Sequence, residues 1–308
     1  MPPGSTPRRP TRRAITAAAV GAVGVAAAGV AASTLGRSRA AETGAAPSPS
    51  SATADSAHAP AAPGWILEWE DGFDLPALDT ATWTVVQGPG QSDLRDQHVN
   101  DPAMVRLEGG NLVVTARRED ADGLPYRAGS ITTRGKRTLG PHGRLTSWQL
   151  LTAGTGVGVG VALFGQDIDE VGWPACGEID ATEIALGRPG APFGSVHGPG
   201  YSGGAAISGT YAGPLTSVVD RWVEHTLDWN AERIEWALDG VVYQTARRDD
   251  PRATGGWPFD QPCFVQVFVT VGSFASGDVD LADWPVAADG VPEFTARFDG
   301  IRFERWQS

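Results

Sequence analysis

The sequence predicts an all-β protein, and three observations support that prediction. Glycine and proline are frequent, at 40 and 23 of 308 residues, and they interrupt the chain about every ten residues. The runs between them are short and rich in Val, Thr, Ile and aromatic residues, which favour strands. No segment carries a long apolar stripe with the 3.6-residue period of a helix. This pattern is typical of a β-sandwich.

Several runs predict individual strands because they are apolar or alternate apolar with polar residues. The segment RIEWALDGVVYQT also predicts a hairpin, with Asp239-Gly240 at its turn. The remaining expected strands are NLVVTARR (111–118), GRLTSWQLL (143–151), GVGVALF (158–164), CFVQVFVTVG (263–272) and FTARFDGIRFERW (294–306).

Residues 1–40 are expected to be an export signal. A basic start (8–13) precedes a charge-free run (14–35), and small residues at 38–40 offer a cleavage site. The pair Arg12-Arg13 resembles a twin-arginine signal, the route by which bacteria export folded proteins. The run is also long enough to remain as a membrane anchor. Because it is mostly Ala and Gly, we expect cleavage and no stable membrane association afterwards.

The rest of the chain divides into a linker and one domain. Residues 41–63 are Ala, Pro and Ser without apolar periodicity, which is typical of a flexible linker. Residues 64–308 are of the right length for one large all-β domain, and we expect a secreted monomer.

The charge excludes some partners. The chain has 24 basic and 36 acidic residues, and six of the basic residues but none of the acids lie in 1–40, so 18 basic face 36 acidic residues beyond the signal. Such a surface repels nucleic acid and anionic membranes.

Only two cysteines occur, Cys176 and Cys263, so the domain is not a disulfide scaffold. In an exported protein they can pair. Two separate buried thiols are the alternative, and the sequence leaves both open.

Three acids stand in an otherwise apolar strand-like stretch, CGEIDATEIALG (176–187). On a regular strand Glu178 and Asp180 share a face, whereas Glu183 lies on the other. One β-bulge between 180 and 183 would return Glu183 to the shared face. The two glutamate backbones would then lie about 13 Å apart, and their carboxyl groups would approach to about 5 to 6 Å, near the spacing of retaining glycosidases.

In such an enzyme one carboxylate attacks the anomeric carbon, and the other protonates the leaving oxygen and then activates water. Asp180 would hydrogen-bond the nucleophile and separate the two pKa values. Two other interpretations exist. Calcium binding also uses carboxylates, but ligands along an extended strand cannot wrap one ion. A solvated strand face is the third.

The surrounding motifs resemble glycoside hydrolase family 16, the laminarinase and lichenase group. GWPACGEIDATE is similar to the family's catalytic strand, and SVHGPGYSGG follows it as in the family. Matches also include WEDGFD, VRLEGGNLVVTARRE, HTLDWNAERIEWALDG, WPFDQP and FDGIRFERWQ, so the resemblance covers about Trp65 to Gln307. It implies a β-jelly roll of two antiparallel sheets with a concave substrate cleft.

The resemblance implies roles for single residues. Glu178 corresponds to the nucleophile, Glu183 to the general acid/base and Asp180 to their helper. Trp173 would stack on a sugar ring, or else is an ordinary core residue. His197 lies on the neighbouring strand close to the acids, where a structural histidine is the alternative. No cofactor is expected for catalysis.

The resemblance also implies a structural calcium ion, held by the carbonyls of Gly72 and Gly110 and the side chain of Asp299, unless that site is empty. Oxygen ligands of this kind suit calcium.

The match is weaker in three segments that bind substrate in the family. The segment 154–165 replaces a tryptophan-containing strand, so that Gly158 and Ala162 stand at the tryptophan positions and one face is nearly bare. If that face lines the cleft, we expect a roomier site. The segments 91–101 and 270–277 also differ, and Phe268 stands where the family has Asn.

The resemblance nevertheless implies a secreted endo-β-glycanase that acts with retention on a polysaccharide, foremost β-1,3-glucan or mixed-linkage β-1,3-1,4-glucan. A non-catalytic carbohydrate-binding protein on the same fold is the alternative, as is a glycanase or transglycosylase acting on another polysaccharide such as a galactan.

Overall fold

The computed structural model describes residues 63–90, 95–188, 191–272 and 276–307. The predicted signal and all of the predicted linker but its last residue lie outside these ranges, so both remain predictions. Within the described ranges, no helix has the length and apolar character needed to cross a bilayer.

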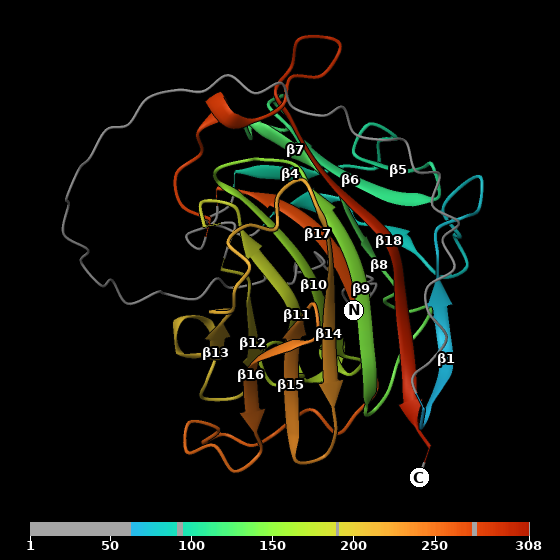
Figure 1. Cartoon of the computed structure of the whole chain (residues 1–308), viewed down its shortest axis with the longest axis vertical. Coiled ribbons are helices and arrows are strands. Elements are labelled where there is room, and N and C mark those ends of the chain that lie inside the picture. The colour runs from blue at the N-terminus through green and yellow to red at the C-terminus, as the bar shows by residue number, and fades with distance from the viewer. Residues whose placement is uncertain (1–62, 91–94, 189–190, 273–275, 308) are drawn as a thin grey trace, which may run out of the picture.

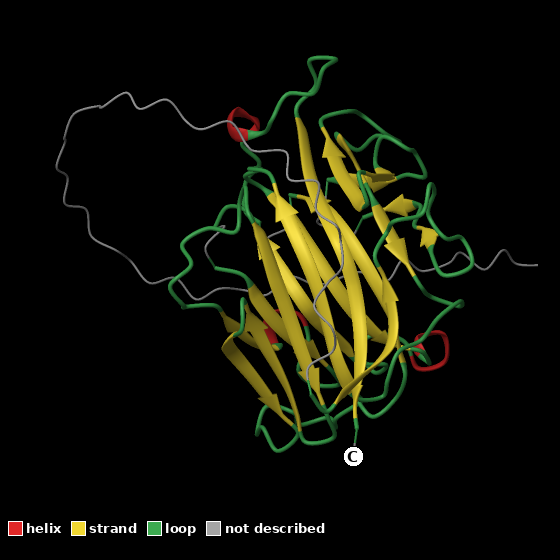
Figure 2. Cartoon of the chain, turned by 45° about the vertical axis from the view of Figure 1, so that its right-hand side comes forward, coloured by secondary structure: helices red, strands yellow, loops and turns green. Residues whose placement is uncertain are grey.

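The described strands form two sheets, which lie one behind the other in Figures 1 and 2. The larger sheet contains, in spatial order, β16 (Val241–Arg247), β15 (Arg233–Leu238), β14 (Trp222–Trp229), β9 (Gly143–Leu151), β18 (Glu293–Trp306), β6 (Asn111–Arg117), β7 (Tyr126–Ala128), β4 (Asp96–His98) and β3 (Gly88–Pro89), with β1 (Trp65–Asp71) beside β18 and β5 (Val105–Glu108) beside β6. The smaller sheet contains β13 (Ile207–Thr210), β12 (Phe193–His197), β11 (Glu178–Ala185), β10 (Val157–Gly165), β17 (Cys263–Val271), β8 (Ser130–Thr132) and β2 (Thr84–Val85).

Three short helical turns complete the described structure: α1 (Ile168–Val171), η1 (Gly203–Ala205) and η2 (Leu281–Asp283). The predicted all-β jelly roll of two packed sheets is therefore confirmed. One detail departs from the prediction of antiparallel sheets, because β4 pairs with β7 in parallel.

The expected strands all form, and β9 has the predicted bounds. The predicted hairpin joins β15 to β16 through Asp239 and Gly240, whose φ angles are 46° and 75°. Both lie in the left-handed region, which a two-residue hairpin of this type requires and which Asp-Gly adopts readily.

The core fills the space between the sheets. In β14 and β15 buried and more exposed residues alternate, so each strand turns one face inward. The two central strands of the smaller sheet, β10 and β17, are buried on both faces over most of their length. The outer face of the smaller sheet is therefore covered as well, by side chains that surround the acids of β11.

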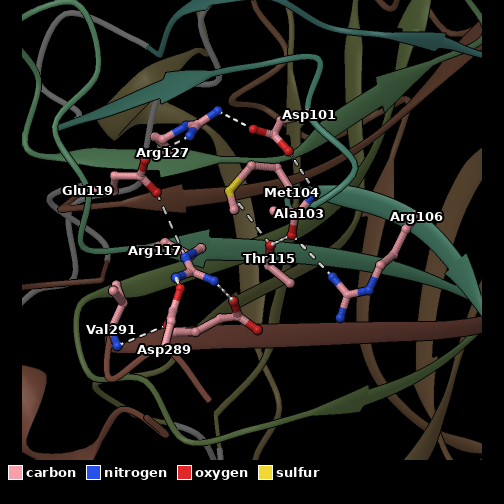
Figure 3. A network of polar contacts seen from close by, with 11 residues as sticks. Asp101, Ala103, Met104, Arg106, Thr115, Arg117, Glu119, Arg127, Asp289 and Val291 are labelled. Carbon is pink, nitrogen blue, oxygen red and sulfur yellow. Dashed lines mark hydrogen bonds and ion pairs between the residues drawn. The ribbon is translucent and has the colours of Figure 1, made fainter. Parts of the chain in front are cut away.

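A network of ion pairs joins strands and loops at one end of the larger sheet (Figure 3). Arg117 of β6 binds Glu293 at the start of β18 (2.8 Å) and Asp289 in the preceding loop. Arg127 of β7 binds Asp101 in the loop before β5. The network ties three sequence-distant segments together, and each guanidinium in it is already matched by carboxylates.

One tryptophan links the larger sheet to the acid-bearing strand. Trp236 of β15 is fully buried, and its indole N–H donates to the backbone carbonyl of Asp180 in β11 (2.8 Å). The bond crosses the core, so it fixes the position of β11 relative to the larger sheet.

Replacing Trp236 by Phe is expected to destabilise the protein by about 1–3 kcal/mol, because the buried Asp180 carbonyl loses this donor. Urea unfolding followed by circular dichroism measures the effect. The same change at Trp222, which is 42% exposed, is the control and should alter the free energy of unfolding by no more than about 0.5 kcal/mol. Equal stability of the two variants would show that the cross-core bond contributes nothing.

Candidate active site

The three acids project from the outer face of the smaller sheet. Ile179, Ala181 and Ile184 of β11 belong to the hydrophobic core between the sheets. Glu178 and Asp180 point the other way and are paired across the sheet with residues of β10 and β12. Alternation along the strand thus separates the apolar from the acidic side chains, as the sequence predicted.

The predicted bulge is present. Asp180 pairs with Ser195 of β12, but the next paired residue on β11 is Glu183, opposite Phe193. The register against β10 shifts at the same place, so β11 carries one extra residue between Asp180 and Thr182. Because of this insertion, Glu183 returns to the face of the other acids.

Side-chain contacts confirm these directions. The Thr182 hydroxyl accepts a bond from the Gln149 amide of the larger sheet (3.3 Å), so it faces the core. Glu183 accepts from the Ser195 hydroxyl of β12 (3.2 Å) on the outer face. Ser195 in turn accepts from Ser208 of β13 (3.0 Å).

Asp180 is held by His197, one strand away. The Nε2 of His197 lies 2.9 Å from the Asp180 carboxylate, and both side chains are almost fully buried. The Nδ1 of His197 accepts from the backbone N–H of Gly203 (3.1 Å). Since Nδ1 is an acceptor, Nε2 carries the proton and donates it to Asp180.

Glu178 is fully buried beside Trp173. The indole N–H of Trp173 donates to one Glu178 carboxylate oxygen (2.6 Å), while the other oxygen is buried without a partner among the described residues. Trp173 also lies 5.9 Å, ring to ring, from His197. Trp173 is half-buried, so it contacts the acids directly and keeps part of its surface accessible.

Burial and mutual repulsion set the charge of the cluster. Burial raises the pKa of the Glu178 carboxyl well above its usual range, and the neighbouring charge of Asp180 raises it further. The same two causes raise the pKa of Glu183. The Asp180 side chain interacts with both glutamates, so the same neighbour raises the pKa of Glu178 and the pKa of Glu183.

Glu178, Asp180 and His197 also bring ligand atoms within 4.8 Å of one another, which is compact enough for a metal ion. The hydrogen bonds argue against that use, because both His197 nitrogens are already engaged and a ligating histidine needs a free lone pair.

The expectation of a bare face on β10 is wrong at its centre. Gly160 pairs with Glu183 on one side and Phe268 of β17 on the other. A Cβ on Gly160 would lie 2.2 Å from the Phe268 ring, so that ring covers the glycine. Phe268 packs in one cluster with Ala162, and the space beside Glu183 holds an aromatic side chain from the next strand.

The segments that depart from the family pattern fall only partly in the described ranges. The Asp96 carboxylate of β4 accepts from the backbone N–H of Val271 at the end of β17 (2.9 Å), which joins segment 91–101 to segment 270–277. Residues 91–94 and 273–275 lie outside the described ranges.

The residues expected to bind calcium come together away from the acids. Positions Gly72 and Gly110 both lie against the Asp74 carboxylate, because a Cβ on either would be 3.0–3.1 Å from its oxygens. The side chain of Asn111 donates to Asp299 (3.1 Å). The carboxylates of Asp74 and Asp299 therefore lie close to these positions, and carboxylate oxygens suit a hard cation.

The two cysteines are free and buried. Burial raises the pKa of the Cys176 thiol to about 12, so it is unreactive as a nucleophile.

Three contributors to the site were not predicted from the sequence: Ser195, Phe268 in its role as a cover for Gly160, and Trp236. Ser195 could have been found, since it lies two residues before His197 and so shares its face. Phe268 and Trp236 lie on β17 and β15, and the sequence does not show which strands pack beside these two.

Comparisons with known proteins identify the family of the chain. Residues 104–285 match the model of "Glycosyl hydrolases family 16". A beta-glucanase of Rhodothermus marinus is 31% identical over 258 residues, which are 80% of this chain and 87% of that protein. A glucan endo-1,3-beta-glucosidase of Cryptopygus antarcticus is 30% identical over 260 residues, covering 79% and 93%. The structure of the endo-beta-1,3-glucanase from Pyrococcus furiosus matches with a TM-score of 0.72 at 28% identity, covering 79% and 95%.

The family match spans more than half of the chain, and both relatives align over most of their own length. The chain is a glycoside hydrolase and belongs to glycosyl hydrolases family 16.

Proposed function

We propose that the protein is an exported endo-β-1,3-glucanase that cleaves internal bonds of a glucan with retention of configuration. The observation that carries the proposal is the bulge in β11, which places Glu178 and Glu183 on one face with Asp180 between them. The two relatives described above, a beta-glucanase and a glucan endo-1,3-beta-glucosidase, support the substrate.

Glu178 is proposed as the nucleophile. Its carboxylate attacks the anomeric carbon and forms a glycosyl ester while the bond to the leaving oxygen breaks. The Trp173 N–H donates to Glu178 at 2.6 Å and stabilises its ionised form. This donor offsets part of the burial that raises the pKa of Glu178.

Glu183 is proposed as the acid and base. We assign the proton to Glu183, because burial raises the pKa of its half-buried carboxyl and the hydrogen bond that it accepts from the Ser195 hydroxyl is longer, at 3.2 Å. Glu183 gives this proton to the leaving oxygen and then takes one from the water that hydrolyses the ester. Both glutamates contact Asp180, which supports a carboxyl separation near the roughly 5–5.5 Å of retaining enzymes.

Asp180 and His197 are proposed as positioning residues. The neutral His197 fixes Asp180 by one N–H bond, and Asp180 then modulates the charge on both glutamates. Stacking of Trp173 on a sugar ring remains part of the proposal, supported by its partial exposure.

The acidic composition supports a neutral polysaccharide as partner rather than nucleic acid or an anionic membrane. We also propose export by the twin-arginine route, which is supported by the basic start and the charge-free run of residues 1–40. The exported protein is proposed to be a monomer.

A structural calcium ion is proposed at the oxygen-rich cluster described above. The carbonyls of Gly72 and Gly110 and the carboxylate of Asp299 would hold it. Bound there, calcium supplies charge neutralisation that ties the start of the domain to β18.

A glycan panel tests the substrate and the nucleophile together. The wild-type chain should release reducing ends from laminarin, and proton NMR should show the β anomer forming first. Glu178→Gln should lower turnover at least about 1,000-fold without loss of folding, because the nucleophile is gone while burial of a charge is relieved.

Glu170→Gln, which changes an exposed residue of helix α1, is the matched control and should keep full activity. Full activity of Glu178→Gln would refute the nucleophile. Binding of glucans with no release from any glycan would favour a carbohydrate-binding protein, and longer products by mass spectrometry would indicate a transglycosylase.

The pH profile of kcat/KM should respond separately to the two donors. Trp173→Phe removes the donor that stabilises ionised Glu178, so the pKa of Glu178 rises and the acidic limb moves up by about one pH unit. Ser195→Ala acts on Glu183 in the same direction and should move only the alkaline limb upward. Joint movement of both limbs in either variant would contradict the assignment of roles.

Removal of calcium with EDTA should lower the thermal midpoint by about 5 °C, since an ion bound only by the folded state stabilises it. In Asp299→Asn this response to EDTA should be nearly lost, whereas exposed Asp249→Asn should keep it. Identical EDTA responses in the two variants would place any bound ion elsewhere.

A further inference from the structure

Strand β1 begins beside the end of β18 (Figure 1), and a hollow lies there on the larger sheet. It has a volume of about 480 Å³ and is lined by three tryptophans, Trp65, Trp229 and Trp306, together with polar residues that include Asp228, Asn230 and Arg305. Sites for small ligands commonly have volumes of roughly 300–1,000 Å³ and combine aromatic walls with a few polar groups. We call it the Trp306 pocket.

The aromatic wall is exposed yet fixed. Trp306 is 60% exposed, which leaves a large apolar ring in water. The rings of Trp306 and Trp65 make a T-shaped contact, with a centroid distance of 5.3 Å and an interplanar angle of 79°. Gly64 lies so close that a Cβ there would be 2.6 Å from the Trp306 ring, and the Gln307 N–H donates to the Gly64 carbonyl (2.7 Å). The ring therefore needs little further ordering to receive a ligand.

The polar rim is electrically balanced. Arg144 binds Asp228 through two hydrogen bonds (2.6 and 2.7 Å) and lies over the Trp65 ring at 4.3 Å. Arg305 is paired with Glu68, and Arg233, which also lines the pocket, lies 3.7 Å from Glu235. Because these charges are matched within the protein, the pocket favours an uncharged ligand over an anion or a cation.

Asn230 adds a directed polar group. Its side-chain oxygen accepts from the backbone N–H groups of Glu232 and Arg233, each at 3.0 Å. These bonds fix the orientation of the amide, whose NH₂ group is then positioned as a donor. A flat apolar ring beside fixed donors and acceptors matches a pyranose, which has apolar C–H faces and equatorial hydroxyl groups.

We propose that the Trp306 pocket is a second glycan-binding site that takes pyranose units of a neutral glucan. The identity of that glucan rests on the proposed function. The pocket is built from the larger sheet, whereas the acids project from the outer face of the smaller sheet, so the two sites are separate. A chain held here stays near the enzyme without occupying the acids, which benefits attack on an insoluble polymer.

The test uses the full chain and insoluble β-1,3-glucan. In a Glu178→Gln background, Trp306→Ala should weaken binding to the particles about tenfold, as expected for loss of a central tryptophan. Trp222→Ala, an exposed tryptophan of the same sheet outside the pocket, is the matched control and should bind normally. With Glu178 intact, Trp306→Ala should lower turnover of the particles but not of a short soluble oligosaccharide.

Trp306→Phe, which keeps a ring, should restore part of the binding, and thermal midpoints of all variants check folding. Equal binding by Trp306→Ala and Trp222→Ala would overturn the proposal. So would an equal loss of oligosaccharide turnover, or a concentration-dependent dimer that Trp306→Ala abolishes. Failure of the proposed function shows instead as no reducing ends from any glucan, whatever the particle binding.

Discussion

One extra residue in β11 controls the orientation of the whole site. Without it, Glu183 would face the core, where an unpaired carboxylate costs several kcal/mol, and only two of the three acids would share a face. The insertion is supported from behind by two bonds that cross the core, from Trp236 to the Asp180 carbonyl and from Gln149 to the Thr182 hydroxyl. The larger sheet thus holds the bulged part of β11 in position.

Clustering three acids reduces the stability of the fold and makes the chemistry available. Because the pKa values of Glu178 and Glu183 are raised, the folded state binds protons more tightly than the unfolded chain. The fold is therefore most stable at acidic pH, where these carboxyl groups are protonated. It loses this stability as the pH rises through the raised pKa values and the groups ionise. The burial that raises these pKa values also keeps water away from Glu178, whose side chain is fully buried.

The sequence predicted those features that depend on local pattern. The strands follow from their composition, the hairpin from Asp239-Gly240, and the bulge from the spacing of Glu178, Asp180 and Glu183 with the requirement that they act together. Features that depend on which strands are neighbours were not predictable in the same way. The glycines of β10 indicated an open face, but Phe268 covers Gly160 because β17 lies beside β10 in the sheet. The Trp306 pocket likewise joins the two ends of the domain, which are distant in sequence.

The identity of the nucleophile is the central claim, and covalent trapping tests it most directly. A 2-deoxy-2-fluoro β-glucosyl donor should form a stable ester with the enzyme, because the fluorine slows its hydrolysis. Peptide mapping by mass spectrometry is predicted to find the sugar on Glu178. A label on Glu183 or another residue, or no label together with an α-configured first product, would contradict the account.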